Sequence, residues 1–232
     1  MQISPVTGRA ASRRRLVLVL GLLLASSLVV GGIALRVLTH RNLELTNLVW
    51  NLFLAWVPFV FALAFYDGAR NGTRSRSLVA LGGVWLVFLP NAPYLVTDVK
   101  ILDHLVGRVE WYDVVLAVGS ATLGLVLGFI SLYLVQAVVS ARLGRGAGWL
   151  LATGALGLSG LGVYLGRYQR WNSWEVLTEP SKIFGGLGEG LLDPLAHARP
   201  LAVSMLFAVA CFGGYAVFYA VFQPQLRRLE ER

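Results

Sequence analysis

The chain has 232 residues, of which 56% are hydrophobic and only 14% are charged, and its mean hydropathy is +0.68. Soluble domains average about 45–50% apolar and 25% charged residues, so this composition excludes an ordinary soluble globule. The formal net charge of +8 would also fit a nucleic-acid-binding protein, but no nucleic-acid motif occurs where the required elements could form. In a membrane protein such a charge is typical of cytoplasmic loops.

Six uncharged apolar runs predict six transmembrane helices, because lipid offers the backbone no hydrogen-bond partners and only helices or closed barrels cross it. The first follows three consecutive arginines and is interpreted as an uncleaved signal anchor. Six spans leave too few residues for a separate soluble domain, so residues 1–232 are predicted to form a single integral membrane domain, an all-α polytopic transmembrane helical bundle. The predicted spans are about 16–35, 45–66, 77–96, 114–141, 147–166 and 201–222.

The distribution of Lys and Arg predicts that the N-terminus and the C-terminus are both cytoplasmic, since cytoplasmic loops carry the excess of these residues. With this orientation the inner segments hold 12 of the 20 basic residues and have a net charge of +9, against −1 for the outer segments. The longer loops, between spans three and four and between spans five and six, then lie outside. We therefore expect the protein to act at the outer face of the membrane.

A first group of polar residues lies where the third predicted span is interrupted, at 90–94. Two prolines three residues apart remove two helical hydrogen bonds, and broken helices at membrane depth are tolerated only where protein or a water-filled cavity meets the freed groups. The sequence therefore predicts a polar cavity in the outer half of the bundle. The alternative is that the amides join helices and the prolines merely kink one. The candidate cavity residues are Asn47, Asn51, Asn91, Tyr94, Thr97 and Asp98.

A second group follows the fifth predicted span. Arg167 and Arg170 lie one turn apart if the helix continues, and would form a cationic fork for a phosphate or carboxylate. The alternative is an aromatic belt at the membrane surface, with arginines that extend to lipid headgroups. The candidate residues here are Arg167, Arg170, Trp171, Asn172, Trp174 and Glu175, and Asp113 lies in an acidic loop that follows the third span.

Two more specific kinds of site, a metal site and a protease active site, have weaker support. Asp98, His104 and Asp113 are suitable ligand types for a hard or borderline cation, but their spacing depends on a loop and no metal-binding motif contains them. The segment 157–160 matches the GxSG string of rhomboid proteases, yet no predicted span contains the His that would activate the serine. The glycines at 154, 157, 160 and 162 are better interpreted as a face for close helix packing.

The segment 182–200 has leucine and isoleucine at helical spacing, although four glycines and Pro194 weaken the pattern. It is predicted to form a short interfacial or re-entrant element that covers the outer cavity, with a plain outer loop as the alternative.

Four phrases of the sequence resemble the bacterial multi-pass membrane proteins of the domain of unknown function 1361 family. They are NLVWNLFLAWVP at 47–58, FLPNAPYLVTD at 88–98, WYD at 111–113 and VYLGRYQRWNSWEVL at 163–177. The resemblance covers about 47–184 and implies a bacterial multi-pass protein of the cytoplasmic (inner) membrane, but no reaction, substrate or catalytic residue. Glu175 stands where an Asp is expected, which keeps the carboxylate.

Together these features predict a polar, outward-facing site that binds an anionic small molecule or lipid headgroup. One alternative is a membrane enzyme acting on a lipid-linked or envelope substrate, with Asp98 or Asp113 as a base or metal ligand and the arginines neutralising phosphate. Another is a structural partner in a membrane assembly. The expected partner in every case is the lipid bilayer, with no nucleic acid; the patterns leave open whether the protein is an enzyme and which cofactor it would use.

Overall fold

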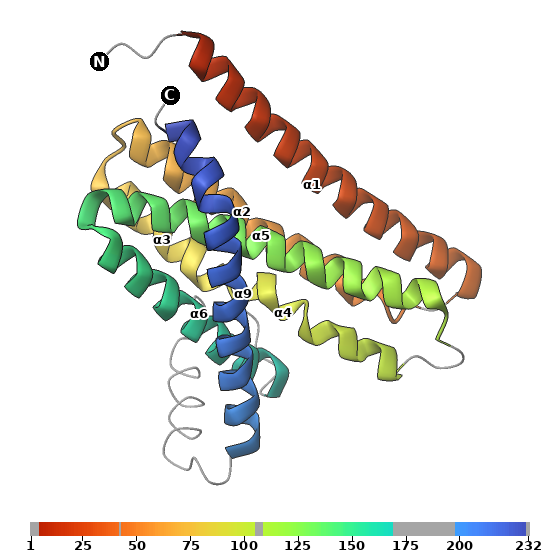
Figure 1. Ribbon diagram of the computed structural model, residues 1–232. Helices are drawn as coiled ribbons and strands as arrows, with labels where there is room; N and C mark the ends of the chain where they lie inside the picture. The colour runs from red at the N-terminus through yellow and green to blue at the C-terminus, as the bar shows by residue number, and fades with distance from the viewer. Residues whose placement is uncertain (1–4, 42, 105–108, 169–197, 231–232) are drawn as a thin grey trace.

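The computed structural model describes residues 5–41, 43–104, 109–168 and 198–230. These residues are helical apart from short connections and form no strand. Among these described residues, six helices are long and apolar enough to cross a membrane, which confirms the predicted all-α bundle with six spans. The start of the first helix and the end of the last both lie at the top of Figure 1. The candidate spans are Arg13–His40, Thr46–Arg70, Ser75–Lys100, Trp111–Leu143, Arg145–Arg167 and Leu201–Phe222.

Several helices extend beyond the predicted apolar runs, since polar flanks continue the same helix. This matters most for Arg36, which directly follows the predicted span of 16–35 and which the structure places inside the first helix. The elements are α1 (Pro5–His40), α2 (Thr46–Arg70), α3 (Ser75–Phe88), α4 (Asn91–Tyr94), the 3-10 helix η1 (Thr97–His104), α5 (Trp111–Leu143), α6 (Arg145–Tyr168) and α9 (Ala198–Glu230).

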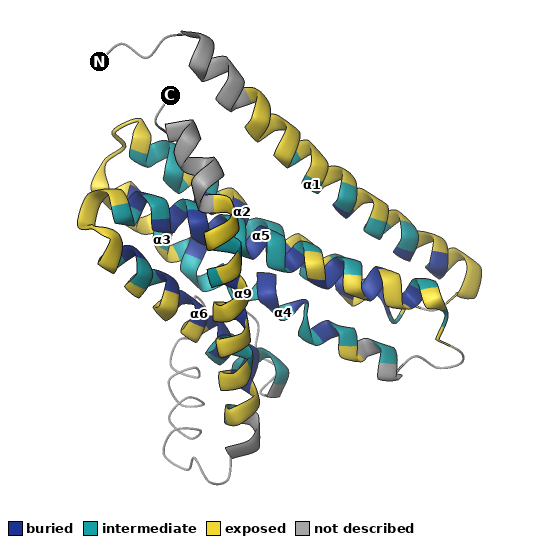
Figure 2. Cartoon of the chain, in the orientation of Figure 1, coloured by how far each residue is buried: buried dark blue, intermediate teal, exposed yellow. Residues whose placement is uncertain are grey.

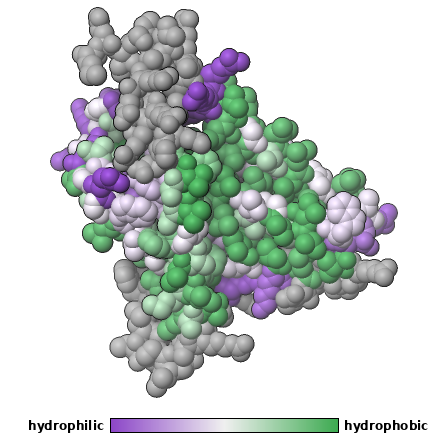
Figure 3. Space-filling model, in the orientation of Figure 1, coloured by the Kyte–Doolittle hydropathy of each residue, from purple (hydrophilic) through white to green (hydrophobic). Residues whose placement is uncertain are grey.

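Helix α5 is the centre of the bundle. It contacts α1, α2, α4, α6 and α9 and is buried at intervals along its whole length. The described parts of α1 and α9 are mostly exposed (Figure 2), and the surface over the helices is broadly hydrophobic, with hydrophilic residues gathered at its margins (Figure 3). Such a surface is expected to face lipid, because lipid tails are as apolar as the side chains they meet.

The third span is broken at its two prolines, as the sequence predicts. Helix α3 ends at Phe88, α4 occupies one turn, and the chain continues as the 3-10 helix η1. Backbone groups at the break are paired locally: the Asn91 side-chain amide donates to the Phe88 carbonyl at 3.0 Å, and the Thr97 hydroxyl donates to the Tyr94 carbonyl at 2.7 Å. Part of the polarity at 90–97 therefore serves to stabilise the break itself.

Glycines on two neighbouring helices allow the break to pack closely against them. A Cβ atom at Gly124 of α5 would lie 2.4 Å from the Ala92 carbonyl oxygen, and one at Gly162 of α6 would lie 2.6 Å from the Pro90 ring. Ala92 itself is fully buried. The broken segment is thus held between α5 and α6, and this packing positions the residues that follow it.

The glycine face predicted on α6 is only half correct. Gly160 approaches α9, where an added Cβ would lie 2.8 Å from the Ser204 carbonyl oxygen, and Gly162 approaches the break, but Gly154 and Gly157 have nothing within 4 Å. Ser159, between these positions, is buried and donates to the Ala155 carbonyl at 2.9 Å. In this fold the GxSG string therefore lies in a packed helix, with its serine bonded to the helix's own backbone.

Candidate functional site

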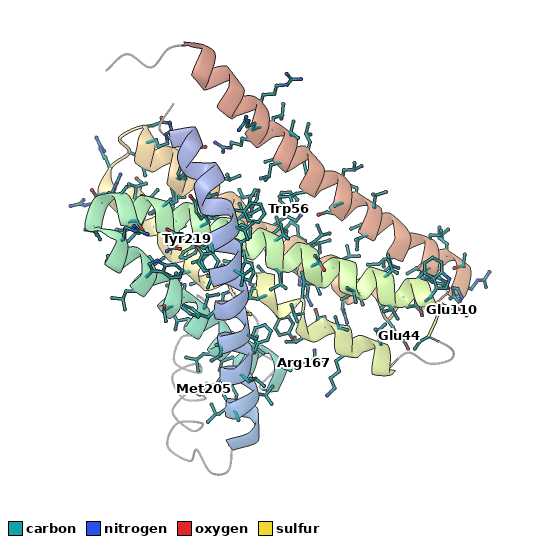
Figure 4. The ribbon with its side chains drawn as sticks, viewed as in Figure 1. Glu44, Trp56, Glu110, Arg167, Met205 and Tyr219 are labelled. Atoms are coloured by element: carbon teal, nitrogen blue, oxygen red, sulfur yellow. The ribbon has the colours of Figure 1, made fainter. Side chains whose placement is uncertain are left out.

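The structure brings predicted polar residues together around the buried carboxylate of Asp98, whose side chain is 11% exposed. The Asn51 amide donates to Asp98 Oδ2 at 2.6 Å, and Arg167 Nη1 lies 3.4 Å from Asp98 Oδ1. Three segments that are distant in sequence, α2, η1 and the end of α6, therefore meet at one carboxylate. Figure 4 shows Arg167 beside the broken third span.

Tyr94, on α4, completes this group. It is partly buried and lies close enough to interact with both the Asp98 carboxylate and the Arg167 side chain. We call Asn51, Tyr94, Asp98 and Arg167 the Asp98 cluster. All four were candidates from the sequence, and the structure assembles them from α2, α4, η1 and α6.

Local packing explains why Asp98 occupies this position. Leu95, three residues earlier, is fully buried, and its carbonyl accepts the Asp98 backbone N–H at 3.2 Å in the turn that leads into η1. The break therefore delivers a carboxylate to the bundle interior rather than to the surface. A charged side chain in this setting requires partners, because desolvation of an unpaired charge is strongly unfavourable.

Arg167 differs from its partner in exposure. Its side chain is 28% exposed, compared with 11% for Asp98. The separation of 3.4 Å is also longer than the roughly 2.7–2.9 Å of a tight charge-assisted hydrogen bond. Since a guanidinium carries five N–H donors, Arg167 retains donors that can bind a further acceptor.

Other predicted residues are placed apart from this cluster. Asn47, one turn before Asn51, is exposed, and Asn91 bonds to the backbone of the break. The remaining residues of the second group, and the segment 182–197 of the predicted covering element, lie outside the described residues. Those site residues are Arg170, Trp171, Asn172, Trp174 and Glu175.

Asp113 belongs to a different buried structure, an ion pair with Arg36. The side chains of Arg36 and Asp113 are 5% and 0% exposed. The guanidinium donates from Nε to Oδ1 and from Nη2 to Oδ2, the second at 3.2 Å, and the backbone N–H of Glu110 donates to Oδ2 at 3.2 Å. The carboxylate also lies in the first turn of α5, where the helix dipole favours negative charge. Asp113 is thus engaged in joining α1 to α5.

The buried position of Arg36 was not predicted from the sequence, although its place on the first helix indicates it. Ile33, three residues earlier, is 1% exposed, and residues three apart share one helix face. Extending the helix by one turn past the apolar run would have placed Arg36 on the buried face of α1. It would then have required an acidic partner on a neighbouring helix.

The described residues contain no group of three or more His, Cys, Asp or Glu that could hold a metal ion. Asp98 and Asp113 each pair with an arginine, and the His104 side chain lies outside the described part of the structure. The metal site with these three ligands remains a prediction from sequence.

The fold and the cluster define a class: an all-helical protein with six helices suited to span a membrane and a buried polar cluster at the break in the third. Residues 50–212 match the family described as "Protein of unknown function (DUF1361)", so the chain belongs to this family. The match confirms the resemblance and extends it beyond 184, into α9. Comparison with curated proteins gives no match, and comparison with solved structures gives none either.

Proposed function

We propose that the Asp98 cluster belongs to an outward-facing site that binds the phosphate or carboxylate of a small molecule or lipid headgroup, in a multi-pass protein of the bacterial cytoplasmic membrane. The observation that carries the proposal is the partly exposed guanidinium of Arg167 held beside the buried Asp98 carboxylate. Ionisable residues within membrane spans are rare and are usually functional.

The chemistry of the cluster fits anion binding. Asp98, which accepts from the Asn51 amide at its other oxygen, holds one edge of the guanidinium, and the planar arrangement of the remaining donors suits a carboxylate or phosphate. Arg170 is predicted to add a second positive charge close by, so that the site as a whole carries net positive charge.

The outward orientation follows from the charge distribution and is tested by labelling. Lys100 ends the third span next to the cluster, and Arg70 ends α2 at the end remote from Asn51. Both are exposed, while Cys211 is buried. In a Cys211→Ser background we expect Lys100→Cys to react with a membrane-impermeant maleimide on intact cells, and Arg70→Cys to react only after permeabilisation. The reverse pattern would place the cluster in the cytoplasm.

Binding is tested by thermal unfolding of the purified protein in detergent, with inorganic phosphate, glycerol phosphate or citrate. A ligand at 100 times its Kd stabilises the folded state by about 2.7 kcal/mol. We expect one of these anions to raise Tm for the wild type and for Asn47→Ala, but not for Arg167→Gln. If no anion raises Tm, or if Arg167→Gln responds like the wild type, the proposal is wrong.

One contact supports a second candidate function, that of an enzyme. A carboxylate 3.4 Å from an arginine is an arrangement suited to a base beside a phosphate-binding cation. Both Asp98 oxygens already have partners, which favours a positioning role over proton transfer. The enzyme would be favoured if the wild type turns over a phosphorylated, lipid-linked substrate and Asp98→Asn does not. In that case Asp98→Asn should still show the binding that depends on Arg167.

A further inference from the structure

A second site is suggested by an apolar groove at the opposite end of the third span from the Asp98 cluster. Helix α3 packs mainly on α2, and α6 packs mainly on α5 and α9, so a groove of about 560 Å³ remains between α3 and α6 over α5. Its lining is almost entirely hydrophobic. The lining residues include Leu78 and Leu86 of α3, Val138 and Val139 of α5, and Leu151 and Leu158 of α6.

The groove has the length of one lipid leaflet. It is lined along α3 from Ser75 to Leu86, which at 1.5 Å per residue is roughly 16 Å. The hydrocarbon core of a bilayer is about 30 Å thick, so this is about half of it. A groove that begins at one end of the membrane-spanning helices and extends about halfway across matches the extent of one acyl chain.

The end of the groove carries positive charge. Arg142 lines it, and one guanidinium nitrogen donates to the Ala69 carbonyl at 3.1 Å, which holds the side chain at the groove. Arg74 and Arg76 flank Ser75, and all are exposed. Asp67, an acidic residue near this end, is already paired with Arg15 at 2.7 Å.

The first turn of α3 adds hydrogen-bond donors at the same place. Its N-cap residue, Arg74, makes no side-chain capping bond, and Ser75 lines the groove. The Ser77 N–H already donates to the Arg74 carbonyl at 3.0 Å, but the N–H groups that come before it in a helix have no partner within the helix, and such groups attract phosphate. Arginines and helix N–H groups therefore meet at the end of a leaflet-long apolar groove.

We propose that this groove binds an acidic phospholipid of the surrounding bilayer, with one acyl chain between α3 and α6 and the headgroup phosphate on Arg142 and the start of α3. The apolar lining would contact the acyl chain, and the positive charge would bind the headgroup phosphate. This site is independent of the Asp98 cluster, since the two share no residue.

Gly154 provides a way to fill the groove without disturbing the bundle. It lines the groove, and an added Cβ there would meet nothing within 4 Å. Gly154→Leu therefore places a side chain in the space assigned to the lipid. Gly157→Leu is the matched control, because Gly157 has the same open surroundings on the same helix and does not line the groove.

The experiment measures Tm in detergent with added dioleoyl-phosphatidylglycerol, compared with dioleoyl-phosphatidylcholine. We expect phosphatidylglycerol to stabilise the wild type, Gly157→Leu and Arg167→Gln more than phosphatidylcholine does. Gly154→Leu should lose the response to both lipids, and Arg142→Gln should lose the preference between them. If Gly154→Leu does not fold, Val79→Phe fills the groove from the exposed part of α3.

Three results would overturn the proposal: equal effects of the two lipids on the wild type, an unchanged phosphatidylglycerol response in the groove-filling variant, or a wild-type dimer that this variant converts to monomer. The last result would assign the groove to a second copy of the chain. A response lost in Arg167→Gln but retained in Gly154→Leu would assign the lipid to the Asp98 cluster instead.

Discussion

Replacing Arg36 by Met is expected to lower the free energy of unfolding by about 3–5 kcal/mol, because removing one partner of a buried ion pair leaves the other charge buried and uncompensated. Asp113 is fully buried and accepts from two guanidinium nitrogens. The change is measured by equilibrium unfolding with sodium dodecyl sulfate in mixed micelles.

The protein contains its own control for this prediction. Arg15 and Asp67 also form a two-point ion pair from α1, at 2.7 and 2.8 Å, but their side chains are 46% and 41% exposed. Exposed pairs contribute about 0–1 kcal/mol, so Arg15→Met should change stability little. Arg36→Met/Asp113→Asn should recover part of the loss, since no charge is left unpaired. Equal effects of Arg15→Met and Arg36→Met would show that burial does not control the strength of these pairs.

Gly124→Ala is expected to destabilise the protein by roughly 3 kcal/mol, near the top of the usual range for overpacking. The added Cβ would lie 2.4 Å from the Ala92 carbonyl oxygen and 2.7 Å from the Leu95 side chain. A backbone carbonyl cannot rotate away as a side chain can, so the broken segment must move. Because Asp98 follows Leu95 by three residues, the same substitution should also abolish stabilisation by an anion at the Asp98 cluster.

Gly119→Ala is the matched control on the same helix. An added Cβ at Gly119 would lie 3.5 Å from the nearest Val29 methyl group, an ordinary van der Waals distance. We expect it to retain both the stability in mixed micelles and the anion response of the wild type. If Gly124→Ala behaves like Gly119→Ala, the close packing of the break on α5 is not what positions Asp98.

The spans and the break were predictable because they depend on local chemistry. A run of apolar residues long enough to cross the bilayer specifies a helix wherever it packs, and Pro90 and Pro93 remove backbone donors regardless of their neighbours. For the same reason the break between α3 and α4 lies where the sequence places it.

Side-chain partnerships were less predictable, because they depend on how far each helix extends and how it is rotated against its neighbours. Asn47 and Asn51 share one face of α2, yet only Asn51 reaches Asp98. Gly157 and Gly160 are three residues apart on α6, yet only Gly160 closely approaches another helix. Arg36 was not predicted as a buried residue because the apolar run ends before the helix does.

Anion binding at the Asp98 cluster is tested most directly by the affinity of the purified protein for glycerol phosphate, measured by isothermal titration for the wild type, Arg167→Gln and Arg15→Gln. We predict a loss of at least about tenfold for Arg167→Gln, equivalent to 1.4 kcal/mol, and little change for Arg15→Gln, whose arginine lies in an exposed pair remote in the fold. Equal affinities of all three proteins, or no binding by the wild type, would contradict it.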